Sequence, residues 1–216
     1  MAPPFPFIPL LADRRSAVKI GAQTVTAFDA GFEIQDRAHT GEVSAVTLKN
    51  TGASFAIVGH SERRRMGETD EAARAQFAAA LGAGLSTILC VGEKERMPDG
   101  SHVATVEGQI RSAFAGVQSL AHRALVAYEP VWAIGKNASE AVSPVALEEM
   151  ALFIKKILSD ILGRAAARKI PILYGGAVEP ANAERLLAEG GVAGFLVGHA
   201  SADADSFIKI LKACKK

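Results

Sequence analysis

The sequence has 216 residues, 49% of them hydrophobic, which is enough to bury one sizeable core. Its 24 basic and 23 acidic residues leave a formal net charge of +1, so nothing in the charge favours nucleic acid or a membrane as a partner. Two cysteines are too few for a disulfide framework, and no apolar stretch has the length of a membrane span. We therefore predict one cytoplasmic domain over residues 1–216.

Short apolar segments alternate with longer amphipathic segments along the chain. Two helix starts are well marked, by Ser143 before Pro144 and by Glu179 before Pro180. The alternation is typical of an α/β protein with a parallel sheet, either open or closed into a barrel. The predicted strands are Val18–Gly21, Phe55–Gly59, Thr87–Gly92, Ala124–Tyr128, Ile170–Tyr174 and Gly194–Gly198, and helices are predicted at Glu71–Leu81, Pro144–Leu162 and Ala181–Glu189.

Several predicted strands end in glycine or in a polar residue suited to chemistry. Such ends favour a barrel, because the loops after all strands of a barrel converge on one face, whereas an open sheet has one switch point. The sequence contains no Gly-x-Gly-x-x-Gly turn before a helix and no Walker lysine loop, so a nucleotide cofactor is not supported. These strand ends are Gly59-His60, Gly92-Glu93, Tyr128-Glu129, Tyr174-Gly175-Gly176 and Gly198-His199.

One carboxylate, Glu129, directly follows the apolar segment Ala124–Tyr128, where a buried strand gives way to a loop. The loop begins with Pro130, contains the only tryptophan of the chain and reaches Gly135, whose amide can approach an anion closely. A carboxylate beside a loop that excludes water is suited to removing a proton from carbon. A lone strand-end glutamate is more commonly a solvated ion-pair partner, so this interpretation depends on the rest of the chain.

A second group lies in residues 57–64, where His60 follows a strand and precedes a short predicted helix. A helix N-terminus disfavours a positive charge, so a neutral imidazole at this position can donate a hydrogen bond to a carbonyl. Glu62 and the neighbouring arginines would orient the ring and balance its charge. The ordinary alternative is a structural histidine. A metal site is not supported, because no second His or Cys has ligand spacing.

Two glycine turns follow the last two predicted strands, at Gly175-Gly176 and at Gly198-His199. Backbone amides exposed by glycine, together with a helix start near Ala200, form a site for an anion. Most glycine pairs are only tight turns, but the loops after the last two strands of a barrel commonly bind phosphate. Their position therefore predicts a phosphate site.

These segments resemble the triosephosphate isomerase family in their order and spacing. The similarity runs from about Ala2 to Lys212. Its most specific parts are the segments that contain Glu129 and His60. The matching segments are 20–23 (Ile-Gly-Ala-Gln), 40–44 (Thr-Gly-Glu-Val-Ser), 59–64 (Gly-His-Ser-Glu-Arg-Arg), 67–70 (Gly-Glu-Thr-Asp), 127–135 (Ala-Tyr-Glu-Pro-Val-Trp-Ala-Ile-Gly), 173–176 (Leu-Tyr-Gly-Gly) and 196–198 (Leu-Val-Gly).

The resemblance implies a (β/α)8 barrel that interconverts dihydroxyacetone phosphate and glyceraldehyde 3-phosphate through an enediolate, without a cofactor or a metal. It implies that Glu129 is the base that moves the proton between adjacent carbons and that His60 polarises the carbonyl. It further implies that Ser61 and a buried Glu62 support the histidine. The implied phosphate contacts are Gly135, Gly175, Gly176, Gly198 and His199, and the implied lid is Pro130, Val131, Trp132, Ala133 and Ile134, continuing to Asn137.

The chain departs from the family pattern at its start. The family opens with a strand that carries an Asn-x-Lys motif, whereas residues 1–5, Met-Ala-Pro-Pro-Phe, resemble the segment after the family's second strand. We therefore expect a barrel that lacks its first β-α-β unit and the lysine of that motif. Losing one electrostatic donor commonly costs on the order of 10²–10³ in rate, so we expect weak or no activity from this chain alone.

Such a gap would leave two open strand edges. We expect another copy, a companion fragment or the N-terminal residues Phe5 and Phe7 to close it, and we predict a homo-oligomer, a dimer or larger. The lid is also about two residues longer than usual. Ala177 replaces a common serine, and His199 replaces a glycine and either adds a cationic phosphate contact or narrows the site.

Two alternatives remain open on the sequence. The altered lid is compatible with an isomerase of a longer sugar phosphate, such as a tetrulose phosphate. A protein of another class, which kept the fold to bind a sugar phosphate or to serve in an assembly without catalysis, is the second alternative.

Overall fold

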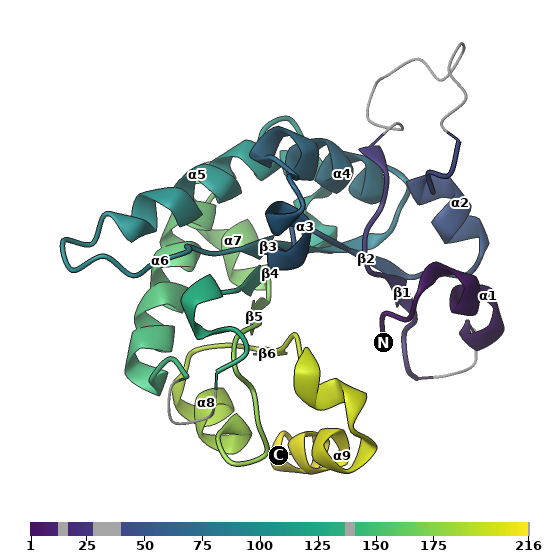
Figure 1. The fold of residues 1–216 in the computed structure, drawn as a ribbon. Helices are drawn as coiled ribbons and strands as arrows, with labels where there is room; N and C mark the ends of the chain where they lie inside the picture. The colour runs from purple at the N-terminus through teal and green to yellow at the C-terminus, as the bar shows by residue number, and fades with distance from the viewer. Residues whose placement is uncertain (13–16, 28–39, 137–140, 216) are drawn as a thin grey trace. The chain divides into compact units, whose positions relative to one another are not determined.

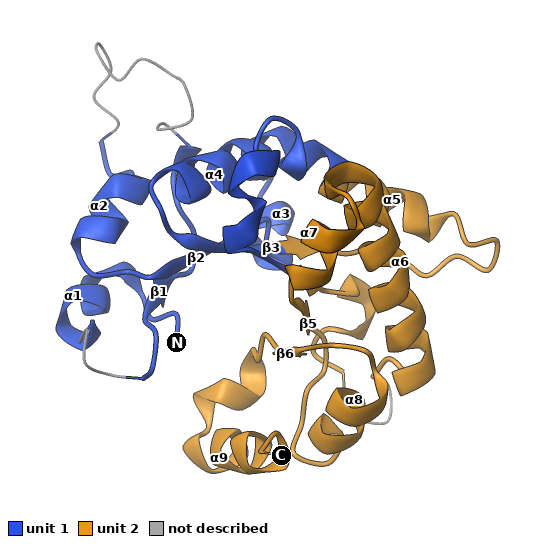
Figure 2. Ribbon diagram, turned by 180° about the vertical axis from the view of Figure 1, so that it is seen from behind, with its two compact units in different colours: residues 1–89, 111–125 blue, residues 90–110, 126–216 orange. Residues whose placement is uncertain are grey.

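The computed structural model describes residues 1–12, 17–27, 40–136 and 141–215 (Figure 1). The chain divides into two compact units, which are coloured separately in Figure 2. The first unit contains residues 1–89 and 111–125, and the second contains residues 90–110 and 126–216. The boundaries fall within β3 (Ser86–Val91), α5 (His102–Phe114) and β4 (Ala124–Tyr128).

The first unit is built on parallel strands that are neighbours both in the sequence and in the sheet. β1 pairs with β2 from Gly21 opposite Phe55, and β2 pairs with β3 along its whole length. Helical segments connect successive strands, as parallel pairing requires. Besides its parts of β3, α5 and β4, this unit contains η1 (Phe5–Phe7), α1 (Ile8–Leu11), β1 (Gly21–Ala22), α2 (Ala45–Asn50), β2 (Phe55–Val58), α3 (Ser61–Arg65), α4 (Asp70–Gly82) and η4 (Gln118–Arg123).

The second unit follows the same plan. β4 pairs in parallel with β5, with Tyr128 opposite Tyr174, and β5 pairs in parallel with β6. Helix α6 packs against α7 and α8 on one side of these strands. Besides its parts of β3, α5 and β4, this unit contains η5 (Val131–Ala133), α6 (Pro144–Leu162), α7 (Arg164–Lys169), β5 (Ile172–Tyr174), α8 (Ala183–Glu189), β6 (Gly194–Phe195), η7 (His199–Ala202) and α9 (Ala204–Ala213).

Each predicted strand overlaps an observed one. Only Ala124–Tyr128 has the predicted bounds, and three strands differ from their prediction by more than one residue at an end. β1 begins at Gly21, three residues later than predicted, and Val18 is exposed. β5 begins at Ile172, because Pro171 has no amide hydrogen to donate to a neighbouring strand. β6 ends at Phe195, although Leu196 still donates its amide hydrogen to the Tyr174 carbonyl at 2.9 Å.

Helix starts follow the capping residues. α6 has the predicted bounds, because the Ser143 hydroxyl accepts from the Ala146 amide and Pro144 occupies the first helical position. α8 begins at Ala183, two residues later than predicted, because the Asn182 side chain accepts from the Glu179 amide at 2.8 Å and holds the preceding residues in a turn. Among the described residues no helix, α6 included, is long and apolar enough to cross a membrane.

Each unit has an apolar core. In the first, the buried rings of Phe77 and Phe114 meet edge to face, with centroids 5.1 Å apart and planes at 60°. In the second, α6 buries Leu147 and Ile154 completely. Two aromatic side chains that are also fully buried, Tyr128 and Tyr174, end β4 and β5. The ends of these two strands are therefore rigidly packed.

The first residue of the chain lies beside β1. The Met1 ammonium donates to the Lys19 carbonyl at 2.7 Å, and the Gly21 amide donates to the Met1 carbonyl at 2.9 Å. Lys19 and Gly21 flank Ile20, so Met1 bonds to the residues on either side of the one that it faces. This is the hydrogen-bond pattern of parallel strands. Burial lowers the pKa of this amine. Met1 thus occupies the position that a residue of a neighbouring parallel strand would occupy.

Candidate active-site residues

Glu129 lies at the end of β4 in the second unit and is only 2% exposed. Its backbone amide donates to the Val91 carbonyl at 2.8 Å, which fixes the backbone of Glu129 against the end of β3. On the other side, the Gly175 amide donates to the Tyr128 carbonyl at 2.8 Å. A carboxylate in this position is removed from bulk water and is held by the backbone on both sides.

Two glycines make room for Glu129. A Cβ atom on Gly92 would lie 1.9 Å from the Glu129 carbonyl oxygen, a distance that no real side chain tolerates. A Cβ atom on Gly175 would lie 2.8 Å from Cγ of the Glu129 side chain. Gly92 is therefore needed for the backbone of the glutamate to approach β3, and Gly175 for its side chain to fit.

The predicted lid begins directly after Glu129. Its first residues form the short 3-10 helix η5, so that Pro130 and Ala133 are buried while Val131, Trp132 and Ile134 are partly exposed. The Val131 amide donates to the Glu93 carbonyl at 3.0 Å. Asn137, at the far end of the predicted lid, lies outside the described residues.

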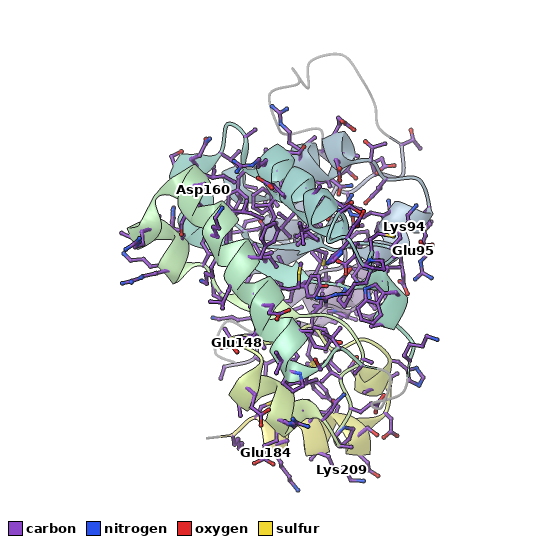
Figure 3. All side chains as sticks on the ribbon, turned by 90° about the vertical axis from the view of Figure 1, so that its left-hand side faces the viewer. Lys94, Glu95, Glu148, Asp160, Glu184 and Lys209 are labelled. Carbon is purple, nitrogen blue, oxygen red and sulfur yellow. The ribbon has the colours of Figure 1, made fainter. Side chains whose placement is uncertain are left out.

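Glu93 is a residue to which the sequence analysis assigned no role, although Gly92-Glu93 is one of the strand ends named there. It is 2% exposed, although the next two residues, Lys94 and Glu95, are exposed (Figure 3). Its Oε1 atom accepts two hydrogen bonds of 2.8 Å, from the Tyr128 hydroxyl and from the Trp132 indole. One carboxylate thus bonds both to the strand that carries Glu129 and to the lid. The only sequence signal for this role is its position directly after Gly92 at a strand end.

The Tyr128 hydroxyl keeps the proton that it donates to Glu93. Burial raises the pKa of the Tyr128 phenol above its ordinary value, and the negative charge of Glu93 raises it further, while Arg96 acts in the opposite direction. A raised phenol pKa keeps the proton on the oxygen. The hydrogen bond to Glu93 therefore persists throughout the neutral pH range.

His60 lies in the first unit, directly before the short helix α3 as predicted, and it caps the N-terminus of that helix. Its Nδ1 atom accepts a hydrogen bond from the Glu62 amide at 3.3 Å. A nitrogen that accepts a hydrogen bond carries no proton, so the neutral ring has its hydrogen on Nε2. This tautomer is the one that leaves Nε2 as a donor.

The two residues after His60 differ from each other. Ser61 is 4% exposed, but Glu62 is exposed, which corrects the expectation of a buried acid at this position. Consecutive helical residues point about 100° apart, so the turn that buries Ser61 leads Glu62 outward. The loop is held instead by Arg64, whose Nε atom donates to the Gly59 carbonyl at 2.8 Å.

The predicted phosphate-binding glycines differ in their exposure and in the space around their Cα atoms. Gly135 is exposed with a φ of 73°, a conformation that favours glycine. Gly176 has no room for a side chain, because a Cβ atom there would lie 2.3 Å from the Tyr174 hydroxyl oxygen. Gly198 and His199 are exposed at the start of η7, which begins one residue before the predicted helix start.

The second unit therefore brings together Glu129, Gly175 and the first lid residues, and Glu93 joins them. The His60 group forms a separate local arrangement in the first unit. Among the described residues, no group of three or more His, Cys, Asp or Glu side chains is placed to hold a metal ion. The groups that these residues offer are carboxylates, an imidazole and backbone amides.

Comparisons with known proteins agree on one family. The family model described as triosephosphate isomerase matches residues 1–214. A triosephosphate isomerase from Alkalilimnicola ehrlichii is 40% identical over 220 residues, which cover 100% of this chain and 85% of that protein. One from Thermus thermophilus is 43% identical over 217 residues, with 97% and 83% covered. The crystal structure of triosephosphate isomerase from Bartonella henselae has a TM-score of 0.84 at 33% identity, and covers 100% of this chain and 86% of that one.

Proposed function

The chain belongs to the triosephosphate isomerase family, with an α/β fold of the TIM-barrel type, and we propose that Glu129 and His60 carry its reaction. The enzyme is an intramolecular aldose–ketose isomerase that interconverts dihydroxyacetone phosphate and glyceraldehyde 3-phosphate. The reaction moves one proton between adjacent carbons and shifts the carbonyl group, so it needs a base, an acid for the oxygens and a site for the phosphate.

Glu129 is the base in this proposal. Its carboxylate removes the proton from the carbon next to the carbonyl and returns it to the neighbouring carbon. Three features of the structure support this role: its burial, the backbone bonds on both sides and the position of the lid directly after it. Excluding water strengthens the electrostatic interactions of the carboxylate and protects the intermediate from side reactions.

His60 is the electrophile. Its Nε2–H donates a hydrogen bond to the substrate carbonyl and then to the enediolate oxygen that forms as the proton leaves carbon. The Nδ1 bond to the Glu62 amide supports this role, because it fixes the tautomer that has Nε2 as the donor. A neutral imidazole suits a donor that must stabilise developing negative charge while keeping its own proton.

The phosphate group is assigned to glycine amides and the lid. Gly135, Gly176 and Gly198 offer amides without a side chain in the way, and His199 adds a donor after the last of them. The predicted contact at Gly175 is not retained, because its amide donates to the Tyr128 carbonyl at 2.8 Å. The lid residues Pro130, Val131, Trp132, Ala133 and Ile134 then close over the bound triose. Ser61 and Glu62 support the histidine, through packing at Ser61 and through the backbone amide at Glu62.

The observation that carries the proposal is the buried Glu129 carboxylate, wedged against Gly175 directly ahead of the lid. A titration tests it, with a phosphorylated carboxylate that mimics the enediolate and with inorganic phosphate for comparison. Transition-state mimics bind at least about 10²-fold more tightly than ground-state ligands, so we expect the mimic to exceed phosphate by that factor. Equal affinity for the two would contradict the assignment, and the Trp132 emission provides the signal.

The finer features of the fold and assembly are also proposals. We infer that these 216 residues form one domain without the family's first β-α-β unit, and that a strand of such a unit would extend the pairing that Met1 begins beside β1. The chain covers 85% of the Alkalilimnicola protein, which is compatible with that inference. We further propose a cytoplasmic homo-oligomer. Light scattering that shows a stable monomer at high concentration would contradict the oligomer.

Weak or no activity of the chain alone stays a prediction, which a steady-state assay of the purified chain tests. A rate equal to that of longer family members would contradict it. The alternative of a longer sugar phosphate rested on the altered lid, whose residues 137–140 lie outside the described residues. It gains no support from the site, and neither does the non-catalytic alternative.

A further inference from the structure

A buried glutamine lies behind the site on α5. Gln109 is 7% exposed and belongs to the second unit, as Glu129 and Glu93 do. Its side-chain amide makes two hydrogen bonds to a single residue: Oε1 accepts from the Gly92 amide at 2.8 Å, and Nε2 donates to the Gly92 carbonyl at 3.2 Å. The glutamine amide therefore pairs with Gly92 as the backbone of a neighbouring strand would.

Gly92 is the residue against which the base is packed. Its Cα faces the Glu129 carbonyl so closely that a Cβ atom would lie 1.9 Å from that oxygen. The preceding residue, Val91, accepts the Glu129 amide at 2.8 Å. The Val91–Gly92 backbone thus lies between Gln109 on one side and the backbone of Glu129 on the other, and a shift of this backbone would move the base.

The residue after Gly92 bonds to the lid. The Glu93 carbonyl accepts from the Val131 amide at 3.0 Å, and its carboxylate accepts from the Trp132 indole at 2.8 Å. Glu93 can serve both partners only if its backbone is held in one place. Gln109 bonds both polar groups of the adjoining Gly92 and so provides that restraint.

We propose that Gln109 is a positioning residue for the isomerase reaction, which sets the Gly92–Glu93 backbone and through it the place of Glu129 and the start of the lid. The inference rests on the proposed role of Glu129. Gln109 acts only through Gly92. A displacement of about 1 Å caused by a remote mutation can cost up to about 10² in rate, which is the scale of effect expected here.

The test compares Gln109→Met with Gln109→Glu. Methionine fills a similar volume without hydrogen bonds, so we expect kcat to fall between about tenfold and 10²-fold while KM changes less than about twofold. Glutamate keeps the acceptor for the Gly92 amide but loses the donor to the Gly92 carbonyl. The kcat of Gln109→Glu should therefore lie between those of the wild type and Gln109→Met. Trp132 is the only tryptophan of the chain, and its emission should shift to longer wavelength in the methionine variant, because its bond to Glu93 is loosened.

The matched control is Gln76→Met. Gln76 is also 7% exposed, lies on α4 in the first unit and donates to Glu68 at 2.9 Å. Losing a buried amide should lower the thermal stability of both methionine variants. Only Gln109→Met should also change kcat and the Trp132 emission. If Gln109→Met lowers stability alone, as Gln76→Met does, Gln109 is merely structural and the proposal is wrong.

Two further results keep the test decisive. If Gln109→Met does not fold, Gln109→Glu takes its place, and an unchanged kcat and Trp132 emission in that variant overturns the proposal. If the wild-type chain neither turns over dihydroxyacetone phosphate nor exchanges deuterium into it, the proposed role of Glu129 fails. The Trp132 emission and the exchange rate of its indole hydrogen still report whether Gln109 holds the lid, so the two failures are distinguishable.

Discussion

The residues proposed for the reaction, His60 after β2 and Glu129 after β4, are held in opposite ways. His60 is fixed locally, because its ring accepts from the amide of a residue two positions later and caps its own short helix. Glu129 is fixed by residues distant in the sequence: its backbone bonds to Val91, and its side chain fits only because Gly175 has no Cβ atom. The imidazole is partly exposed and the carboxylate is buried.

This difference suits the two proposed roles, a hydrogen-bond donor at His60 and a base at Glu129. A hydrogen-bond donor needs a fixed tautomer, which one bond to a backbone amide can supply. A base that removes a proton from carbon also needs a dry environment and an accurate place, which only long-range packing can supply. Substitutions should therefore separate activity from stability at His60 and should couple the two around Glu129.

The largest effect is expected from Glu129→Gln, which keeps the shape of the side chain but removes the base. General acid–base catalysis contributes about 10²–10⁴ in rate, and we expect kcat to fall by that factor. Steady-state kinetics measures the loss. The control is Glu95→Gln, at an exposed glutamate outside the lid (Figure 3), which should retain kcat. A Glu129→Gln variant with more than a tenth of the wild-type kcat would contradict the assignment.

His60→Asn should separate catalysis from folding. Asparagine is a good N-cap, so the free energy of unfolding should change by no more than about 0.5 kcal/mol. It lacks the Nε2–H donor, and removing one such donor costs on the order of 10²–10³ in kcat. Chemical denaturation and steady-state kinetics on the same preparation test both parts. A large loss of stability would show that the ring does more than cap α3.

A substitution at Gly92, directly after β3, should lower stability and activity together, unlike His60→Asn. Gly92→Ala places a Cβ atom 1.9 Å from the Glu129 carbonyl oxygen. We expect it to lower the free energy of unfolding by about 3 kcal/mol, the upper end for overpacking, and to reduce activity with it. The control is Gly67→Ala, at a φ of 103° with no atom within 4 Å of the new Cβ. Backbone strain there costs only about 1 kcal/mol. Equal costs at the two positions would contradict the close packing of the base.

How much of this the sequence predicts depends on how local each interaction is. The strand that ends at Glu129 and the cap at His60 are both recognisable from adjacent residues. Glu93 is not, because its partners Tyr128 and Trp132 are 35 and 39 residues away and nothing near it in the sequence indicates them. Glu62 was expected to be buried, which was wrong, because the sequence does not show which face of a single helical turn packs inward.

Alkaline pH should weaken the packing behind the base. Burial raises the pKa of Tyr174 from 10.0 to about 12, with the backbone amides of Val142 and Ala177 partly opposing the shift. The stability is therefore fully present below about pH 10 and falls as the pH rises to about 12, by about 1.4 kcal/mol per pH unit for each such tyrosine. Tyr174→Phe should reduce this slope, and denaturation at several pH values measures it. An unchanged slope would contradict the burial of the phenol.

The smallest effect concerns another local cap, Asp203 at the start of α9. Its carboxylate accepts from the Ser206 amide at 2.8 Å, and this bond lowers the pKa of Asp203. The contribution to stability is present above the ordinary pKa of 3.8 and is lost as the pH falls through the lowered value. Asp203→Asn should keep the cap and remove this acid dependence, with a small change that thermal unfolding between pH 2 and pH 5 detects. A variant with the same acid dependence as the wild type would refute this role.

Deuterium exchange is the sharpest test of Glu129 as the base, because it follows the proton on carbon itself and can be measured even when turnover is slow. The chain is incubated with dihydroxyacetone phosphate in deuterated water, and NMR follows deuterium at the carbon next to the carbonyl. We expect incorporation by the wild-type chain and almost none by Glu129→Gln. Exchange or product formation at the wild-type rate in Glu129→Gln would contradict this role of Glu129.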